Sequence, residues 1–500
     1  MNRDSRRKLQ GVAGALVVAA LVMLSSCQPG EDTAGSGAGG PEAEASVVVA
    51  QIGDISITKD ELKQRLAQEI RPQRDNYGLA KPVPTAASVL QTMLGEKAMA
   101  LEGRQRNLLD DEITRSSMRQ FRQRQLIRLF LTEYVEEHVS VDEAEIQAAA
   151  ATDPNLTPEQ AESKAYGTKA TQTVNALYDQ LLEQLKVEKV TENFPRAAQI
   201  HQRLLTRPVE TRSRGVFWIT NKQIREELTD EEKQIVMARY TGGQIILRDW
   251  FEAIGQIAPP GRPKDLNTVA GVETFLDRAL KPAIYAAAAV AQGYDKNEQF
   301  LAQMRTREDM MLLGKVRSEK YQEATEPGDD EVKAYYEAHK EQFGKQASLK
   351  VEQIWCPDLG TAEKVKQMVE DGTSFESANA AHGLRKDQKP HNVYPTGEGL
   401  FWDELWKAEP NDVLGPLKGF YDAGVQWRVV KVLEKTPAEP RDYSENAANQ
   451  ARSAIMSQRR DTLLADYAAE LLQKYDHEIF ADRIADIDPL AVTPIDEQGG

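Results

Sequence analysis

The chain has 500 residues, with 62 Lys and Arg against 78 Asp and Glu, which gives a net charge of −16. At roughly 100–200 residues per domain, this length indicates about three domains. Hydrophobic residues make up 41% and charged residues 28%, a balance typical of folded protein. The acidic excess argues against nucleic-acid binding, which requires a basic face. Two cysteines are too few for a disulfide framework or a thiolate metal site.

The N-terminus has the pattern of an export signal. A basic head that includes Arg3 and Lys8 precedes an uncharged apolar run over residues 11–24. This run is shorter than the roughly 20 residues that a membrane-spanning helix needs. Its length matches the apolar region of a signal peptide, so we expect residues 1–26 to be a signal peptide.

The end of this signal, Leu24-Ser25-Ser26-Cys27, resembles a bacterial lipobox, in which the cysteine is acylated and becomes the first mature residue. The resemblance implies lipidation at Cys27, and a non-lipidated signal with an incidental cysteine is the alternative. Cleavage would remove four basic residues and Asp4, leaving 58 Lys and Arg against 77 Asp and Glu, a net charge of −19. Cys356 would then be the only free thiol, which excludes a disulfide within the chain.

Residues 27–46 are rich in Gly, Ala and acidic residues, so we expect a flexible tether. The residue after Cys27 is Gln28. In proteobacterial lipoproteins such a residue generally accompanies sorting to the outer membrane, so the expected location is the cell envelope, facing the periplasm if the cell is Gram-negative.

Two stretches share one order of elements. Residues 47–57 predict a hairpin around Gly53-Asp54, and Thr58 with Glu61 forms a capping-box pattern that opens a helix. Residues 236–257 repeat this order. Ile57 matches Ile246 at an offset of 189 residues, and both Asn107 with Gly293 and Ile146 with Val332 match at 186. Such steady offsets indicate a duplication.

We therefore predict an α+β protein of mainly helical character, with a duplicated helical unit and one α+β module inserted in the second copy. The predicted parts are a signal peptide (1–26), a tether (27–46), a first helical unit (47–230), the N-terminal part of a second (235–345), the module (346–436), a closing helix (437–487) and a disordered tail (488–500).

The inserted module reads as strand, helix, short helix and strand, and its residues resemble the parvulin-type (PpiC-like) peptidyl-prolyl isomerases. The resemblance rests on the turn Gly372-Thr373-Ser374-Phe375, the approach from Asn411 to Leu417 and the last strand around Val429–Glu434. A parvulin module inside a helical unit resembles the SurA and PrsA group of envelope chaperones. The duplicated unit would then be similar to the N-terminal unit of SurA.

The module departs from the family at its two histidines. The first-strand histidine falls at Gln353 and the last-strand histidine at Arg428, while the groove Met and Phe fall at Phe401 and Leu405. The family resemblance implies that the two histidines organise a polar layer above an apolar proline cradle. Because Arg428 is a permanent cation without acceptor capacity, we expect a module that binds proline-containing segments but isomerises them weakly or not at all.

Aromatic residues of the module are the candidates for substrate binding, namely Trp355, Phe375, Trp402 and Trp427. The alternative for this set is ordinary core packing. His382 and His391 could form a metal pair, but a third ligand at recognisable spacing is lacking, so a solvated loop is favoured. We expect no metal and no cofactor.

The function expected from the sequence is a lipid-anchored envelope folding factor that binds unfolded or exported polypeptides through exposed apolar or proline-containing segments. An active isomerase and a structural lipoprotein that scaffolds one envelope complex are the two alternatives. We expect membrane contact through the N-terminal lipid only and no nucleic-acid partner, and the sequence is compatible with a dimer.

Overall fold

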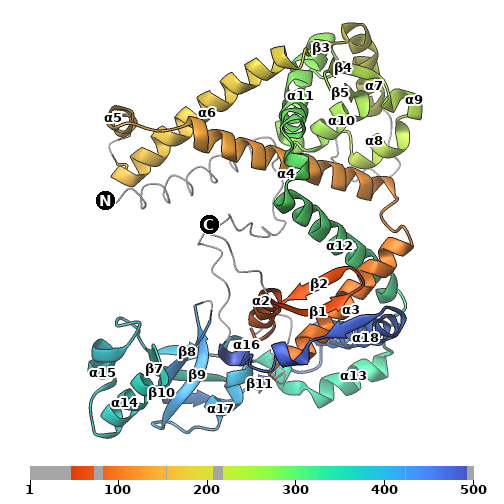
Figure 1. Cartoon of the computed structure of the whole chain (residues 1–500). Coiled ribbons are helices and arrows are strands. Elements are labelled where there is room, and N and C mark those ends of the chain that lie inside the picture. The colour runs from red at the N-terminus through yellow and green to blue at the C-terminus, as the bar shows by residue number, and fades with distance from the viewer. Residues whose placement is uncertain (1–46, 72–82, 154, 207–217, 423, 492–500) are drawn as a thin grey trace. The chain divides into compact units, whose positions relative to one another are not determined.

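The computed structural model describes residues 47–71, 83–153, 155–206, 218–422 and 424–491, and most of these residues lie in helices (Figure 1). The described strands pair antiparallel in sheets of two to four strands. The prediction of a mainly helical α+β protein is confirmed. The predicted signal peptide and the tether with Cys27 lie outside the described residues. Within the described ranges, no helix is both long enough and apolar enough to span a bilayer.

The chain forms two compact units that do not simply follow one another in the sequence. With the gaps given above, unit 1 comprises residues 110–308, and unit 2 combines residues 47–109 with 309–491. The two helical units predicted from the sequence, 47–230 and 235–487, are defined by the repeats, and these boundaries remain a prediction. The compact units divide the chain elsewhere, because unit 2 brings both ends of the described chain together.

The helical part of unit 2 begins with the predicted hairpin. Strands β1 (Val48–Ile52) and β2 (Ile55–Thr58) pair around Gly53, which has a φ of +56°, and β12 (His477–Ile479) adds to the free edge of β1. Thr58 caps the following helix: its hydroxyl accepts from the Glu61 amide, and the Glu61 carboxylate accepts from the Thr58 amide. The predicted hairpin and capping box are both confirmed.

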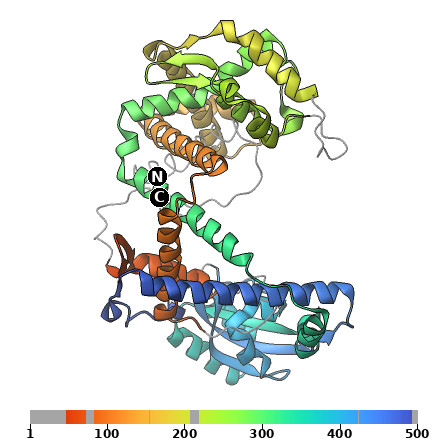
Figure 2. The ribbon, with the colours of Figure 1, turned by 90° about the vertical axis from the view of Figure 1, so that its right-hand side faces the viewer.

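The helices of this part are α2 (Lys59–Glu69), α3 (Ala86–Gln105), the C-terminal half of α12 (Glu298–Tyr321), α13 (Asp329–Ala338) and α18 (Glu445–Lys474), with the 3-10 turns η4 (Lys340–Gln342), η6 (Ala481–Arg483) and η7 (Pro489–Ala491). Helices α2 and α18 pack on α3, and α13 packs on α18 (Figure 2). Gly95 permits the close approach of α3 to α18, since a Cβ at this position would lie 2.7 Å from the Cβ of Ala468.

Unit 2 also contains the inserted module, whose sheet has the order β8-β7-β10-β9. The strands are β7 (Ser348–Cys356), β8 (His391–Val393), β9 (Val413–Tyr421) and β10 (Gly424–Thr436), and β6 (Gly344–Lys345) pairs with β11 (Glu439–Pro440) where the chain enters and leaves. The helices are α14 (Leu359–Glu370), α15 (Phe375–His382), α16 (Pro395–Glu398), η5 (Gly399–Phe401) and α17 (Trp402–Trp406).

Unit 1 repeats the three-stranded sheet, in the order β3-β4-β5. Its strands are β3 (Glu188–Lys189), β4 (Val236–Tyr240) and β5 (Gly243–Ile246). Its helices are α4 (Glu112–His138), α5 (Glu143–Thr152), α6 (Pro158–Gln184), η1 (Thr191–Asn193), α7 (Phe194–Thr206), α8 (Asn221–Glu227), α9 (Asp230–Lys233), α10 (Leu247–Gly255), η2 (Pro259–Gly261), α11 (Val269–Ala291), η3 (Tyr294–Lys296) and the first part of α12.

The core of unit 1 contains a buried histidine among aromatic rings. His201 stacks on Phe251 with ring centroids 6.2 Å apart and meets Trp250 edge-on at 6.1 Å. Its Nδ1 is buried without a hydrogen-bond partner among the described residues. Burial, with a smaller contribution from the charge of Arg262, lowers the pKa of His201 from 6.5 to about 4. The folded state therefore holds this imidazole neutral.

We predict that His201 makes unit 1 less stable in acid. Because its pKa is lower in the folded state than in the unfolded chain, its full contribution to stability is present above pH 6.5 and declines as the pH falls towards 4. The loss should reach about 3 kcal/mol in the free energy of unfolding. Urea denaturation between pH 7 and 4 should show a shallower pH dependence for His201→Phe than for the wild type. The control His477→Phe, at an exposed position, should keep the wild-type dependence, and equal slopes in all three proteins would contradict the assignment.

Candidate functional site

The two faces of the module's sheet carry different side chains because neighbouring residues of a strand point to opposite faces. On β7, Gln353 and Trp355 lie on one face, whereas Ile354 and Cys356 pack with α14 and α15 on the other. Arg428 of β10 lies opposite Trp355. The two positions that replace the family histidines therefore meet on one face of neighbouring strands.

Arg428 is the centre of a buried polar network. Its Nη2 donates to Glu398 Oε2 at 2.6 Å, and its Nη1 donates to Glu398 Oε1 at 3.2 Å and to Gln353 Oε1 at 3.0 Å. Arg428 is 1% exposed, and Glu398 and Gln353 are each 8% exposed. The guanidinium thus has a full counter-charge inside the protein, held in a two-pronged geometry that suits the planar fork of Arg.

The amide of Gln353 links this ion pair to His391. Since its oxygen accepts from Arg428, its nitrogen faces His391, with Nε2 to Nε2 at 3.1 Å. An amide nitrogen can only donate, so His391 Nε2 accepts. The proton of the neutral ring is then on Nδ1, which lies 3.1 Å from the carbonyl oxygen of Lys389. The oxygen and the nitrogen of the Gln353 side-chain amide therefore both have hydrogen-bond partners within the protein.

The guanidinium of Arg428 is enclosed on two sides by protein. The ring of Trp355 lies on one side, with its centroid 5.0 Å from Cζ. Gly419 lies close by, and a Cβ at this position would be 2.5 Å from both Cζ and Nε of Arg428. Glycine at 419 is therefore a condition for the buried arginine.

The predicted groove residues are also buried. Phe401 is 7% exposed and packs edge-on against Phe420 with centroids 4.9 Å apart, and Leu405 is 1% exposed. Trp402 stacks on Trp406 with centroids 5.2 Å apart. Leu405 and Trp402 belong to the apolar cluster beside β7 and β10. These side chains fill the module's own core as the structure describes it.

The four aromatic candidates for substrate binding do not lie together. Trp355 and Trp402 share the side of the sheet that carries Arg428, whereas Phe375 and Trp427 pack on the side covered by α14 and α15. Trp427 directly precedes Arg428 on β10, so the alternation of the strand separates them.

The thiol of Cys356 lies in the apolar cluster on this second side. It is fully buried, and burial, aided by the charge of Asp358, raises its pKa from 9.0 to about 11. The thiol is therefore protonated at neutral pH, which makes it a poor nucleophile. His382 and His391 form no metal cluster: the described residues contain no group of three or more His, Cys, Asp or Glu side chains placed to hold an ion.

Two residues of this network, Glu398 and Gly419, were not predicted from the sequence. Glu398 lies 30 residues before Arg428, on the short helix α16. The signal that could have identified it is the burial of Arg428 itself, since a strand alternating in hydrophobicity places residue 428 inside and a buried cation requires an anion. The stretch 391–399 offers Glu398 as its one carboxylate.

We predict that Glu398→Gln destabilises the module by about 3–5 kcal/mol, because it leaves the buried Arg428 without a counter-charge. Hydrogen exchange of the amides of β7 and β10 should accelerate about 10²-fold or more. The matched control is Glu409→Gln, which removes the 71%-exposed carboxylate that pairs with Lys435 in the same module. That change should cost less than about 1 kcal/mol, and equal protection in the two variants would contradict the role of Glu398.

Three solved structures are among those to which the chain is similar. The chain is similar to a SurA-like chaperone of Campylobacter jejuni (10% identity, 40% of this chain and 83% of that one, TM-score 0.20). It is also similar to PrsA of Bacillus subtilis (15%, 37% and 73%, TM-score 0.16) and to PrsA of Bacillus anthracis (14%, 36% and 81%, TM-score 0.21). No curated protein shows a significant match.

The family comparison identifies the module. Residues 327–448 match the family described as the PPIC-type PPIASE domain. The matched stretch contains α13, the four-stranded sheet and the start of α18. The module therefore lies within a stretch that matches a PPIC-type peptidyl-prolyl isomerase domain, and Gln353 and Arg428 occupy buried positions on its two central strands.

Proposed function

We propose that this protein is a lipid-anchored folding factor of the cell envelope, which binds unfolded or exported polypeptides and has weak or no isomerase activity. Its clients are polypeptides with exposed apolar or proline-containing segments. The membrane contact is the lipid on Cys27, and the acidic body and the tether of residues 27–46 lie outside the bilayer.

The observation that carries the proposal is the closed network of Arg428, Glu398 and Gln353. An isomerase has to lower a rotation barrier of about 18–20 kcal/mol about the X–Pro bond, and it can do so only with groups that contact the substrate. Arg428 and Gln353 are 1% and 8% exposed, and their described hydrogen bonds run to one another, to Glu398 and to His391. The two side chains are thus buried within the module, which supports the proposal that they do not act on a peptide.

Exposed apolar side chains on the helices support binding of unfolded chains. Ile113 at the start of α4 is 61% exposed, and Met310 on α12 is 55% exposed. Leu312, in the run Met310–Leu313 on the same helix, is buried. One side of α12 is therefore packed in the core, and another side is exposed to solvent. An exposed Met adapts its shape to varied partners, as in promiscuous binding surfaces.

The first test of the proposal is enzymatic. We expect the purified protein to leave the cis–trans isomerisation rate of an X–Pro peptide at the uncatalysed value. Acceleration that is abolished in Gln353→Ala, with the fold retained, would instead establish the alternative of an active isomerase.

The same preparation should suppress light scattering by a chemically unfolded model protein. Replacing both Ile113 and Met310 with Ser should weaken client binding about thirtyfold or more, since each change removes about 1 kcal/mol or more of apolar burial. The matched control is Leu384→Ser, at a 43%-exposed position of the module, which should retain suppression. A pull-down that recovers one stoichiometric partner in place of many clients would favour the scaffold alternative.

Lipidation has its own test. In cells fed a radiolabelled fatty acid, the wild-type protein should carry the label and partition with membranes. Cys27→Ser should abolish the label, whereas Cys356→Ser should retain it because the buried Cys356 is not the acylated residue. Equal labelling of wild type and Cys27→Ser would contradict the anchor.

A further inference from the structure

The two hairpins are built to the same register. In the first, Ala50 pairs with Ile57, and in the second Ala238 pairs with Ile245, with a β-bulge at the same place in both. The structural offset is therefore 188, and Ile57 corresponds to Ile245. The match of Ile57 to Ile246 made from sequence was therefore wrong by one residue.

Each hairpin receives a third strand in the same way. The Phe480 amide donates to the Val49 carbonyl at 2.9 Å, and the Val190 amide donates to the Met237 carbonyl at 2.9 Å. Val49 and Met237 are again 188 residues apart. One turn further along the chain, Arg483 Nη1 donates to the Val48 carbonyl at 2.6 Å and Asn193 Nδ2 donates to the Val236 carbonyl at 2.8 Å. The third strands are thus equivalent parts of the two repeats.

These third strands are exchanged between the repeats. We define the first repeat as β1 to η1 (residues 48–193) and the second as β4 to η6 (residues 236–483). Strand β3 belongs to the first repeat but pairs with β4 of the second, and β12 belongs to the second but pairs with β1 of the first. Each sheet is consequently completed by the other repeat.

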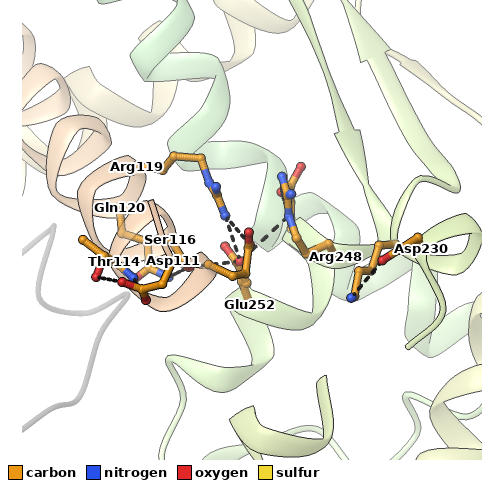
Figure 3. A network of polar contacts seen from close by, with 11 residues as sticks. Asp111, Thr114, Ser116, Arg119, Gln120, Asp230, Arg248 and Glu252 are labelled. Carbon is orange, nitrogen blue, oxygen red and sulfur yellow. Dashed lines mark hydrogen bonds and ion pairs between the residues drawn. The ribbon is translucent and has the colours of Figure 1, made fainter. Parts of the chain in front are cut away.

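The helices of unit 1 show the same exchange. Figure 3 shows Glu252 of α10, in the second repeat, facing α4 of the first repeat. Ser116 Oγ donates to Glu252 at 3.1 Å, and Arg119 pairs with the same carboxylate at 3.5 Å. Deeper in the unit, Tyr285 of α11 donates its hydroxyl to the Val174 carbonyl of α6 at 2.9 Å.

In unit 2 the two repeats change roles: helices of the second repeat pack against α3 of the first. Asp309 on α12, in the second repeat, pairs with Lys97 and Arg104 on α3 of the first, at 3.0 and 2.9 Å. Near the end of α18, the Tyr475 hydroxyl donates to Glu102 at 2.9 Å and to Gln105 at 3.0 Å.

Equivalent helices end in the same way in the two repeats. The chain then changes unit between residues 109 and 110 in the first repeat and within α12, between residues 308 and 309, in the second. Asn107 follows α3 with a φ of +54°, and Gly293 follows α11 with a φ of +86°. The two residues are 186 positions apart, so the same left-handed residue ends the same helix in each repeat before the chain enters the next helix. This shared geometry indicates that α3 and α11 are equivalent elements of the two repeats.

We propose that the two repeats are obligatory partners that exchange their closing halves within one chain, as the subunits of an exchanged dimer do between two chains. The surface that each repeat offers is the free edge of its first hairpin strand together with the apolar side of its second helix, α3 in the first repeat and α11 in the second. The partner that fits this surface is the closing helix and third strand of the other repeat. Neither repeat alone can complete its sheet or bury its core.

The proposal can be tested with cysteine pairs on exposed strand positions. A protease site is inserted between residues 206 and 218 of the full-length protein, in a Cys27→Ser, Cys356→Ala background. The exchanged pairs are Gln51→Cys with Glu478→Cys and Glu188→Cys with Arg239→Cys, which face each other in the two sheets. The matched controls are Gln51→Cys with Glu188→Cys and Arg239→Cys with Glu478→Cys, which would face each other only if each repeat folded on itself.

After oxidation and cleavage, both exchanged pairs should keep the two fragments in one covalent species on a non-reducing denaturing gel, at the mass of a single chain. Both control pairs should release two separate fragments. The proposal is overturned if the control pairs form a bridge within each fragment while the exchanged pairs do not. A species of twice the chain mass would overturn exchange within one chain in favour of exchange between copies.

A second measurement does not depend on disulfide geometry. Cleaved protein without added cysteines should elute from gel filtration as one particle in buffer and as two only in denaturant. Separation of the fragments in buffer would contradict the obligatory partnership of the repeats.

Discussion

The charge of Arg428 has to be neutralised inside the module, because transferring an isolated guanidinium out of water costs far more than a folded domain has to spare. Glu398 supplies the anion, Gln353 an acceptor and Trp355 an aromatic face. Gly419 leaves the space that the guanidinium fills. The module can hold a buried arginine because these four residues act together, and a change at one position affects the others.

This constraint also connects stability to function. A polar group stabilises a buried network when its hydrogen bonds are satisfied internally, whereas a polar group that acts on a substrate must remain free to bind it. In the module, the described hydrogen bonds of Arg428 and Gln353 run to groups within the protein, and under the proposed function these residues serve the first purpose. The functional surface is then expected on the helices, where Ile113 and Met310 are exposed.

The features that the sequence predicted well are local ones. The Thr58 capping box and the Gly53 turn depend on residues within a few positions of one another, and the module was recognisable from its own strand and turn residues. Glu398 could not be found by pattern, because it approaches Arg428 from a stretch without regular periodicity. The exchange was hidden for a different reason. Since both repeats carry equivalent hairpins and closing strands, the sequence favours pairing within a repeat as much as pairing between repeats.

The exchange also sets the order in which the protein can fold as it is synthesised. All segments of unit 1 have emerged once residue 308 has been made, so this unit can form early from contacts of limited sequence separation. Strand β1 emerges first of all, yet its partner β12 begins at His477 and is among the last elements to appear. During that interval the edge of β1 is open to pairing with other chains. A protein proposed to assist folding would itself depend on protection while its own N-terminal strand awaits the C-terminal one.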